Sequence, residues 1–247
     1  MNRKLSQENL KMIACGTMLI DHFAAVLLLE IFPRSNSLID IYSFLRIVGR
    51  LAFPIYCFLL AEGAHYTRNP KKYALRMAIG AVLSELPYDY AFHGGWTMGH
   101  QSVMITLLLG YGALVAMEKC PEFWQKILIC LPFALLAQYL HTDYGAKGVL
   151  LVALFALTRE LPHKRLLQFF GMWLLFSPNH RMMLEWIPRI QQTGRLYLTT
   201  QEWAVLALLP IHAYSGEKRT TSKAIQWGFY LFYPVHLTVL YLWSLLL

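Results

Sequence analysis

Charged side chains are scarce in this sequence. Asp, Glu, Lys and Arg make up 15% of its 247 residues, and hydrophobic residues make up 57%. In a typical soluble domain, about a quarter of all residues are charged. The shortage, together with several apolar runs of about 20 residues, excludes an ordinary soluble enzyme and predicts a polytopic membrane protein.

The chain also lacks the short motifs that identify common enzymes and metal sites. It contains no GxSxG, phosphate-loop, GxGxxG or HExxH pattern. Four cysteines, Cys15, Cys57, Cys120 and Cys130, lie within or beside apolar segments at unrelated spacings, which indicates packing residues. We therefore expect no metal and no disulfide framework. No small-residue cleavage site follows the first apolar run, so we expect that run to stay as a membrane helix.

The apolar runs predict an all-α bundle of about nine transmembrane helices in a single domain, residues 1–247. We expect spans near residues 10–32, 41–63, 73–92, 101–117, 127–140, 148–157, 166–176, 202–214 and 224–246, with an interfacial helix within 177–200. Fourteen of the Lys and Arg residues then fall on the side of the N-terminus and five on the other side. Because positive residues collect in cytoplasmic loops, the N-terminus is expected to be cytoplasmic. The net charge of +8 thus reflects topology, and no nucleic-acid partner is expected.

Asp21 and His22 stand side by side near the middle of the first span. Ionisable residues at that depth are costly and usually face a functional interior. An aspartate that only fixes helix packing through a buried hydrogen bond is the structural alternative. An imidazole beside a carboxylate is an arrangement that raises basicity and fixes the tautomer. Adjacent helical residues point about 100° apart, so Asp21 can instead pair with Arg50 while His22 faces a cavity.

Other polar residues are expected at three depths in the membrane. Helical rise places Arg50 and His236 close to the level of Asp21 and His22. It places Arg46 with Glu85 in the outer half and Arg76 with Glu62 in the inner half. Arg46 and Arg50 are four residues apart and so lie on one helix face, and Pro54 is expected to kink that helix. These pairs can also be purely structural, neutralising one another.

His236 allows two interpretations. A lone histidine on an apolar helix is usually a hydrogen-bonded core residue, whereas Pro234 just before it indicates a local break that opens a site. The remaining histidines that flank outer loops, His93, His100 and His141, do not have the helical spacing of a metal site.

Five stretches together resemble the TraX family of bacterial membrane proteins. They are the membrane-embedded Asp-His of KMIACGTMLIDHFAAVL, the GRLAFPI segment, EGAHYTRNPKKY, SELPYDY and the terminal YPVHL. The resemblance covers nearly the whole chain and is strongest over residues 10–110. Where the family usually has an Asn in the segment that opens the fourth span, this chain has Ser102.

The resemblance implies a multi-pass protein of the bacterial cytoplasmic membrane, surrounded by lipid and similar to transmembrane acyltransferases. The founding member of the family is required for N-terminal acetylation of conjugative pilin. Acetyl-CoA is accordingly the expected co-substrate, and a pilin-like peptide or small molecule is the expected acceptor.

Site roles follow from that resemblance. His22 is the expected base or acyl carrier, Asp21 orients it, and Arg50 stabilises developing negative charge. Glu85, with Asp89, receives an acceptor amine at the outer entrance. Basic residues at the inner mouth hold the phosphates of coenzyme A: Arg68, Lys71, Lys72 and Arg76. Side chains expected around the substrate are Arg46, Glu62, Ser84, Tyr88, Asp89 and His236.

Two other functions remain open from the sequence. A proton-coupled transporter or flippase also uses buried Asp, His, Arg and Glu residues, although two halves with matching broken helices are not apparent. A non-catalytic assembly factor for a surface appendage is the third possibility, and its buried charges should tolerate conservative replacement.

Overall fold

The protein is helical throughout the part that the structure describes. The structure is a computed structural model, and it describes residues 5–32, 35–177, 201–217 and 222–247. The helices are α1 (Gln7–Phe23), the π-helical turn η1 (Ala24–Leu28), α2 (Leu29–Ile31), α3 (Asn36–Gly49), α4 (Ala52–Tyr66), α5 (Pro70–His93), α6 (Val103–Met117), α7 (Phe123–Tyr139), α8 (Gly145–Thr158), α9 (Lys164–Phe176), the 3₁₀ helix η2 (Glu202–Ala207), α11 (Leu208–His212) and α12 (Lys223–Ser244). These ranges contain no β-strand, which confirms the predicted all-α class. The interfacial helix expected within 177–200 lies almost wholly outside the described residues.

The first helical stretch runs without interruption from Gln7 to Ile31 through α1, η1 and α2. It begins where the Ser6 side chain accepts a hydrogen bond from the backbone N–H of Asn9, the usual way to satisfy a free amide at a helix start. The π-helical turn begins two residues after His22. Such turns are rare and often occur at functional positions.

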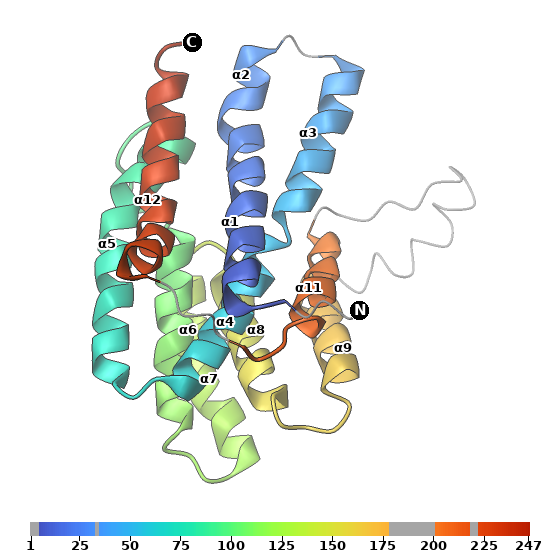
Figure 1. The fold of residues 1–247 in the computed structure, drawn as a ribbon. Helices are drawn as coiled ribbons and strands as arrows, with labels where there is room; N and C mark the ends of the chain where they lie inside the picture. The colour runs from blue at the N-terminus through green and yellow to red at the C-terminus, as the bar shows by residue number, and fades with distance from the viewer. Residues whose placement is uncertain (1–4, 33–34, 178–200, 218–221) are drawn as a thin grey trace, which may run out of the picture.

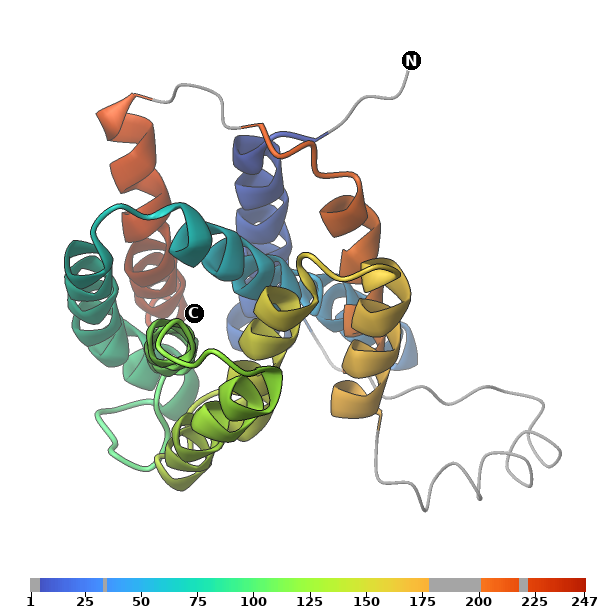
Figure 2. The ribbon, with the colours of Figure 1, turned by 90° about the horizontal axis from the view of Figure 1, so that it is seen from below.

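The second helical stretch is bent between α3 and α4. The two helices are separated by a turn at Arg50 and Leu51, and α4 runs across the molecule when it is viewed from below (Figure 2). Pro54 explains the position of the bend, because its ring clashes with the carbonyl group four residues earlier, that of Arg50. The kink predicted from Pro54 is therefore present, one helical turn before the proline.

The helices form two packed groups that meet at the middle of the molecule. In Figure 1, α1, α2, α3 and α12 rise into the upper part, whereas α4 and α6 to α9 form the lower part, and α5 runs along one side. Helix α8 packs against α4, α6, α7 and α9, and α12 packs along α5 and α1. The main core contains fully buried side chains from several of these helices, among them Leu10, Ile55, Tyr111, Val149 and Leu237.

The predicted count of about nine spans is not confirmed. Among the described residues, two helical stretches are long and apolar enough to cross a membrane, Gln7–Ile31 and Asn36–Tyr66. Helices α6, α7 and α8 have 15, 17 and 14 residues, whereas a bilayer needs about 20. The segment expected as a span at 202–214 is a 3₁₀ helix followed by a five-residue helix. The shorter helices have the apolar composition of a span but not its usual length.

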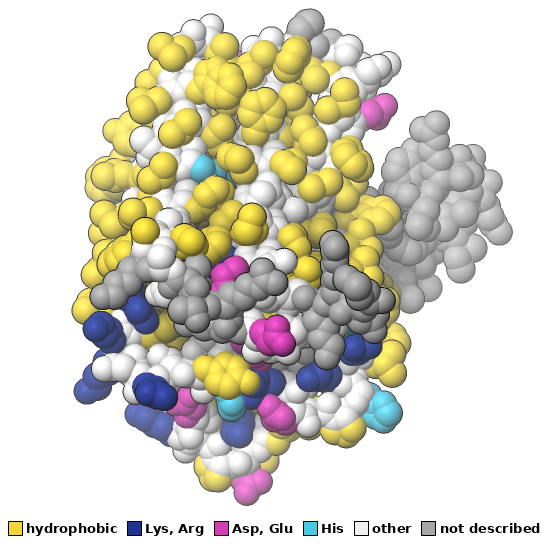
Figure 3. Space-filling model, in the orientation of Figure 1, with side chains coloured by type: hydrophobic (Ala, Val, Ile, Leu, Met, Phe, Trp, Pro, Cys, Tyr) yellow, Lys and Arg dark blue, Asp and Glu magenta, His cyan; other side chains and the backbone are white. Residues whose placement is uncertain are grey.

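Apolar and basic side chains occupy different parts of the surface. Figure 3 shows apolar side chains over the upper part of the molecule and Lys and Arg side chains gathered in the lower part. Exposed apolar residues on the upper helices include Leu19 on α1 and Val239 and Leu242 on α12. Exposed apolar surface on this scale indicates contact with a membrane, in agreement with the two long apolar stretches.

Candidate functional site

A cavity of about 260 Å³ lies where the two groups of helices meet. Its polar lining comes from α1, the end of α3, α5 and the connection between α7 and α8, and includes Asp21, His22, Arg46, Arg50, Tyr88 and Asp143. Aromatic and apolar side chains, such as those of Phe53 and Phe92, close the remaining walls. A cavity on which several polar groups converge is a usual form of a binding site.

Asp21 is held between Arg46 of α3 and Arg50 of the turn that follows α3. Its Oδ2 lies 2.8 Å from Arg46 Nη1, and its Oδ1 lies 3.8 Å from Arg50 Nη2. The expected Asp21–Arg50 pair is thus present, but the expected Arg46–Glu85 pair is wrong. Arg46 lies one turn before Arg50 on the same helix face, so both guanidinium groups reach the same carboxylate.

The close approach of α1 and α3 at this point depends on Gly49. A Cβ atom placed on Gly49 would overlap the Asp21 side chain. We predict that Gly49→Ala displaces the carboxylate from its arginines and destabilises the protein by about 1–3 kcal/mol, as overpacking does in cores. Thermal unfolding of the purified protein in detergent measures the loss.

Gly16 offers a matched control for this substitution. It lies on α1, and nothing lies within 4 Å of a Cβ placed there. Gly16→Ala should leave stability unchanged or raise it by about 0.5–1 kcal/mol, because alanine favours helix more than glycine does. Equal effects of the two substitutions would contradict the packing argument.

His22 contacts His236 of α12, and the expected orienting bond from Asp21 is wrong. The His22 Nδ1 atom lies 2.7 Å from His236 Nε2, and His236 Nδ1 lies 2.7 Å from the carbonyl oxygen of Phe232. The rings of Phe92 and Tyr233 pack edge-on against His22. Asp21 points to α3, whereas His22 points to the cavity and α12. This is the alternative arrangement, in which adjacent helical residues about 100° apart contact different partners. His236 is a buried, hydrogen-bonded residue.

The acidic residues of α5 stabilise the connection to α6. Glu85 accepts hydrogen bonds from the backbone N–H of Ser102, at 3.1 Å, and from its hydroxyl, at 2.5 Å. Asp89 is fully buried and accepts from the backbone N–H of Thr97, while the Ser84 hydroxyl donates to the carbonyl of Gly80 within α5. Of the SELPYDY segment, the side chain that lines the cavity is Tyr88.

Sequence reasoning missed Asp143 and Tyr144, which line the cavity from the α7–α8 connection. The Tyr144 hydroxyl accepts a hydrogen bond from Arg50 at 3.4 Å, and its ring stacks on Phe53 with centroids 3.7 Å apart. Tyr144 has a positive φ of 65°, a strained conformation often found at functional sites. The sequence signal for this site is an acidic residue just after the fifth apolar run, where the runs alone predict an outer loop.

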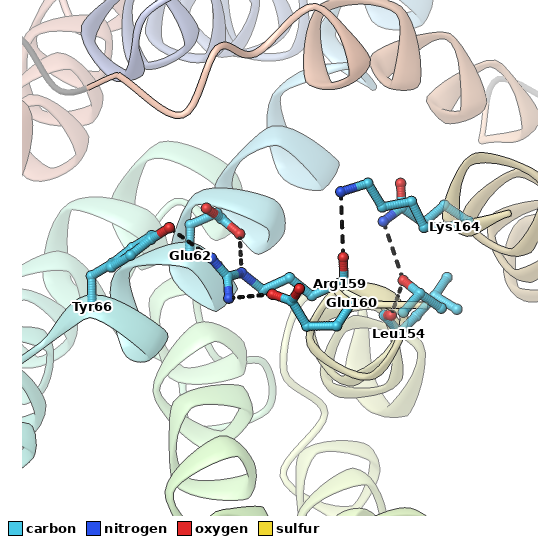
Figure 4. Close-up of polar contacts among 8 residues, drawn as sticks. Glu62, Tyr66, Leu154, Arg159, Glu160 and Lys164 are labelled. Atoms are coloured by element: carbon cyan, nitrogen blue, oxygen red, sulfur yellow. Dashed lines mark hydrogen bonds and ion pairs between the residues drawn. The ribbon is translucent and has the colours of Figure 1, made fainter. Parts of the chain in front are cut away.

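A second polar cluster joins α4 to the end of α8. Glu62 Oε1 lies 2.7 Å from Arg159 Nε, and Arg159 also donates to the Tyr66 hydroxyl and pairs with Glu160 (Figure 4). The expected Glu62–Arg76 pair is therefore wrong. Arg76 lies on α5 near the faces of the Tyr73 and Tyr230 rings.

The two carboxylates that contact Arg159 should differ in their effect on stability. The Glu62 side chain is 11% exposed and that of Glu160 is 81% exposed. We predict that Glu62→Ala costs about 1.5–3 kcal/mol, typical of a buried charged hydrogen bond, and that Glu160→Ala costs less than about 1 kcal/mol. Thermal unfolding of both variants tests this prediction, and a larger loss in Glu160→Ala would refute it.

The basic residues expected to hold coenzyme A lie away from the cavity. Arg68, Lys71 and Lys72 are exposed around the start of α5, where Asn69 caps the helix through the backbone N–H of Lys72. Tyr88 lies 16 residues further along α5, about 24 Å by helical rise. The structure therefore separates this basic group from the cavity residues. No group of three His, Cys, Asp or Glu residues in the described ranges is placed to hold a metal ion.

Comparison with known proteins gives a consistent family assignment. A family model described as TraX protein matches residues 6–244. A probable fimbrial assembly protein FimC, serogroup H1, of Dichelobacter nodosus is 28% identical over 252 residues, which cover 97% of this chain and 96% of that protein. No solved structure matches the chain. Because the family model covers nearly the whole sequence, the protein belongs to the TraX family.

Proposed function

We propose that this protein is a membrane-embedded acyltransferase that carries an acetyl group from cytoplasmic acetyl-CoA to an amine or hydroxyl acceptor. The observation behind the proposal is one cavity that is lined by the imidazole of His22 and the guanidinium group of Arg50. Acyl transfer from a thioester needs a base for the acceptor and a positive group for the oxyanion. The two residue types supply these two functions.

The cavity suits a short acyl group. Its volume of about 260 Å³ is below the range of about 300–1,000 Å³ that holds drug-sized ligands, so it suits an acetyl thioester better than a long fatty acyl chain. Asp21 Oδ1 and Arg50 Nε are buried and have no hydrogen-bond partner in the part of the chain that the structure describes. Buried polar atoms normally have partners, and a polar substrate would provide them.

The proposed reaction proceeds at His22. Its Nε2 takes the proton of the acceptor while the acceptor nitrogen or oxygen attacks the thioester carbonyl carbon. The new bond to carbon forms, and the carbonyl oxygen becomes an oxyanion beside Arg50. The carbon–sulfur bond then breaks, and the departing thiolate of coenzyme A takes the proton from His22, which returns to the neutral form. Transfer through an acyl-histidine is the variant of this mechanism in which His22 itself attacks first.

The basic start of α5 suits the other end of the co-substrate. Arg68, Lys71 and Lys72, with Arg76 one turn further on, would hold the phosphates of coenzyme A. Along α5, Lys72 lies about 24 Å and Arg76 about 18 Å from Tyr88 of the cavity, so the co-substrate must be long enough to extend from the basic side chains to the cavity. Coenzyme A, with phosphates at one end and a thioester at the other, is such a molecule.

The proposed acceptor is the N-terminus of a pilin-like peptide, and the proposed location is the bacterial cytoplasmic membrane, with the N-terminus in the cytoplasm. Support comes from the family and from the D. nodosus relative, whose name describes a fimbrial assembly protein. That name also favours a second candidate, a fimbrial assembly factor without catalytic activity. Catalysis distinguishes the two.

The test is binding and turnover of labelled acetyl-CoA by the purified full-length protein in lipid nanodiscs. The enzyme should bind acetyl-CoA saturably and transfer or slowly hydrolyse the acetyl group, faster when an amine-bearing peptide is added. Absence of both binding and turnover across a panel of acyl-CoAs would refute the proposal. Proton-coupled transport in liposomes would then support a transporter.

A further inference from the structure

The two histidines that meet between α1 and α12 form a directed chain of hydrogen bonds. The chain runs from the carbonyl oxygen of Phe232 to His236 Nδ1, and from His236 Nε2 to His22 Nδ1, with both contacts at 2.7 Å. The two imidazole planes differ by 8°, so the rings lie nearly parallel. Such short, well-oriented contacts restrict where the protons can be.

The positions of the protons follow from the chemistry of the three groups. A carbonyl oxygen accepts hydrogen bonds and cannot donate them, so His236 Nδ1 must carry a proton. A neutral imidazole carries one proton, which leaves His236 Nε2 as an acceptor. His22 Nδ1 must then be the donor, and the lone pair of His22 lies on Nε2. The assignment rests on the hydrogen-bond network, as tautomers generally do.

The surroundings favour neutral imidazoles in both residues. Aromatic rings of Phe92, Tyr233 and Phe232 pack against the pair, and burial among such groups disfavours charge. The nearby charged groups are Asp21, Arg46 and Arg50, and Asp21 forms an ion pair with each of the two arginines. The two arginines direct their hydrogen bonds to Asp21 and Tyr144 and not to the imidazole pair.

His236 is itself held firmly. It is 6% exposed, it is bonded to the carbonyl of the residue four positions earlier on its own helix, and its ring stacks on that of Phe232 with centroids 4.5 Å apart. His22 lines the cavity and His236 does not. The Nδ1 atom of His22 therefore faces α12, and Nε2, the other ring nitrogen, is the one left for a substrate in the cavity.

We propose that His236 is a positioning residue that fixes His22 in the tautomer whose lone pair lies on Nε2, available to a substrate in the cavity. This inference rests on the proposed function of His22 as a base. An imidazole not bonded in this way exchanges between its two tautomers and orientations, so only part of its population presents the basic nitrogen. The role that the sequence suggested for Asp21 is thus performed by a histidine from the other end of the chain.

The first measurement observes the tautomer directly and does not require activity. Full-length protein with ¹⁵N-labelled histidine is reconstituted in lipid, and nitrogen chemical shifts are recorded by solid-state NMR. The signals of His22 are identified by their loss in His22→Gln. We expect a protonated Nδ1 and an unprotonated Nε2 in the native protein. A protonated Nε2 on His22 would overturn the inference, even if the protein proves inactive and the proposed function fails.

The second measurement uses two substitutions at the same position. His236→Phe keeps an aromatic ring on Phe232 but removes both hydrogen bonds, whereas His236→Gln keeps an oxygen that can accept from His22 Nδ1. We expect His236→Phe to lower kcat about 10- to 100-fold, a part of the contribution of a general base, with the KM for acetyl-CoA changed less than about twofold. His236→Gln should restore much of the rate. His65→Phe, at an exposed histidine of α4, serves as the matched control and should leave the rate unchanged.

The outcomes separate this inference from the proposed function. If the native protein is active and His236→Phe retains its kcat, His236 has no positioning role and the proposed function stands. If both His236 variants fold and lose activity equally, the hydrogen bond is not the cause and the inference is refuted. If His236→Phe fails to fold, the native tautomer and the rate of His236→Gln still decide the question.

Discussion

Replacing His22 with alanine is expected to lower the turnover of acetyl-CoA by a factor of about 10²–10⁴, the usual contribution of a general acid–base group. The basic side chains of the cavity lining are Arg46 and Arg50, which are both directed to Asp21, and the imidazoles of His22 and His93. The His93 ring stacks on that of His100, whereas His22 is the proposed recipient of the acceptor proton when the thioester is attacked. Labelled acetyl-CoA turnover in nanodiscs measures the effect.

The control for this substitution is His65→Ala. His65 is exposed near the end of α4 and does not line the cavity, so the loss of its imidazole should leave turnover unchanged. Size-exclusion behaviour and thermal unfolding show whether each variant is folded. A folded His22→Ala variant that retains most of the native rate would mean that the base is another group, and our assignment of His22 would be incorrect.

The second large effect is expected on stability. Asp21→Asn keeps the shape of the side chain but removes the charge that Arg46 and Arg50 share. Their side chains are 21% and 15% exposed, and removing one partner of a buried ion pair leaves an uncompensated charge that costs about 3–5 kcal/mol. We expect a loss of stability of this size, measured by thermal unfolding in detergent.

Two variants examine the cause of that loss. Asp40→Asn makes the same chemical change at an exposed position on α3 and should change stability by less than about 0.5 kcal/mol. Combining Asp21→Asn with Arg46→Met removes one of the two unpaired cations and should recover part of the stability, as expected for coupled residues. If the double variant loses more stability than the two single variants lose together, repulsion between unpaired arginines is not the cause.

The sequence predicted the helices better than the contacts between them. Apolar runs and helix caps are local signals, and the first two predicted spans agree closely with the helical stretches Gln7–Ile31 and Asn36–Tyr66. The pairing of Asp21 with Arg50 was also predictable, because helical rise gives the depth of a residue. The same argument failed for Arg46 and Glu85, since depth does not show which face of a helix is turned to which neighbour.

Other parts of the site depend on packing that no local signal reveals. The α7–α8 connection places Asp143 and Tyr144 beside Arg50, although its sequence is typical of an outer loop. Arg159 reaches Glu62 from the end of α8, and a count of residues along separate spans cannot indicate this. The count of about nine spans is not confirmed for a related reason, because apolar composition by itself does not show whether a short helix crosses a membrane.

The contact between α1 and α12 also has a consequence for how the protein is made. The two histidines lie 214 positions apart in the chain, and α12 is the last of the described helices to be synthesised. A ribosome-bound chain that has completed α11 can already form the Asp21–Arg46 ion pair, but His22 lacks its imidazole partner until α12 is in place. Formation of the imidazole pair therefore waits for almost the entire chain, which would keep the site incomplete in partly synthesised protein.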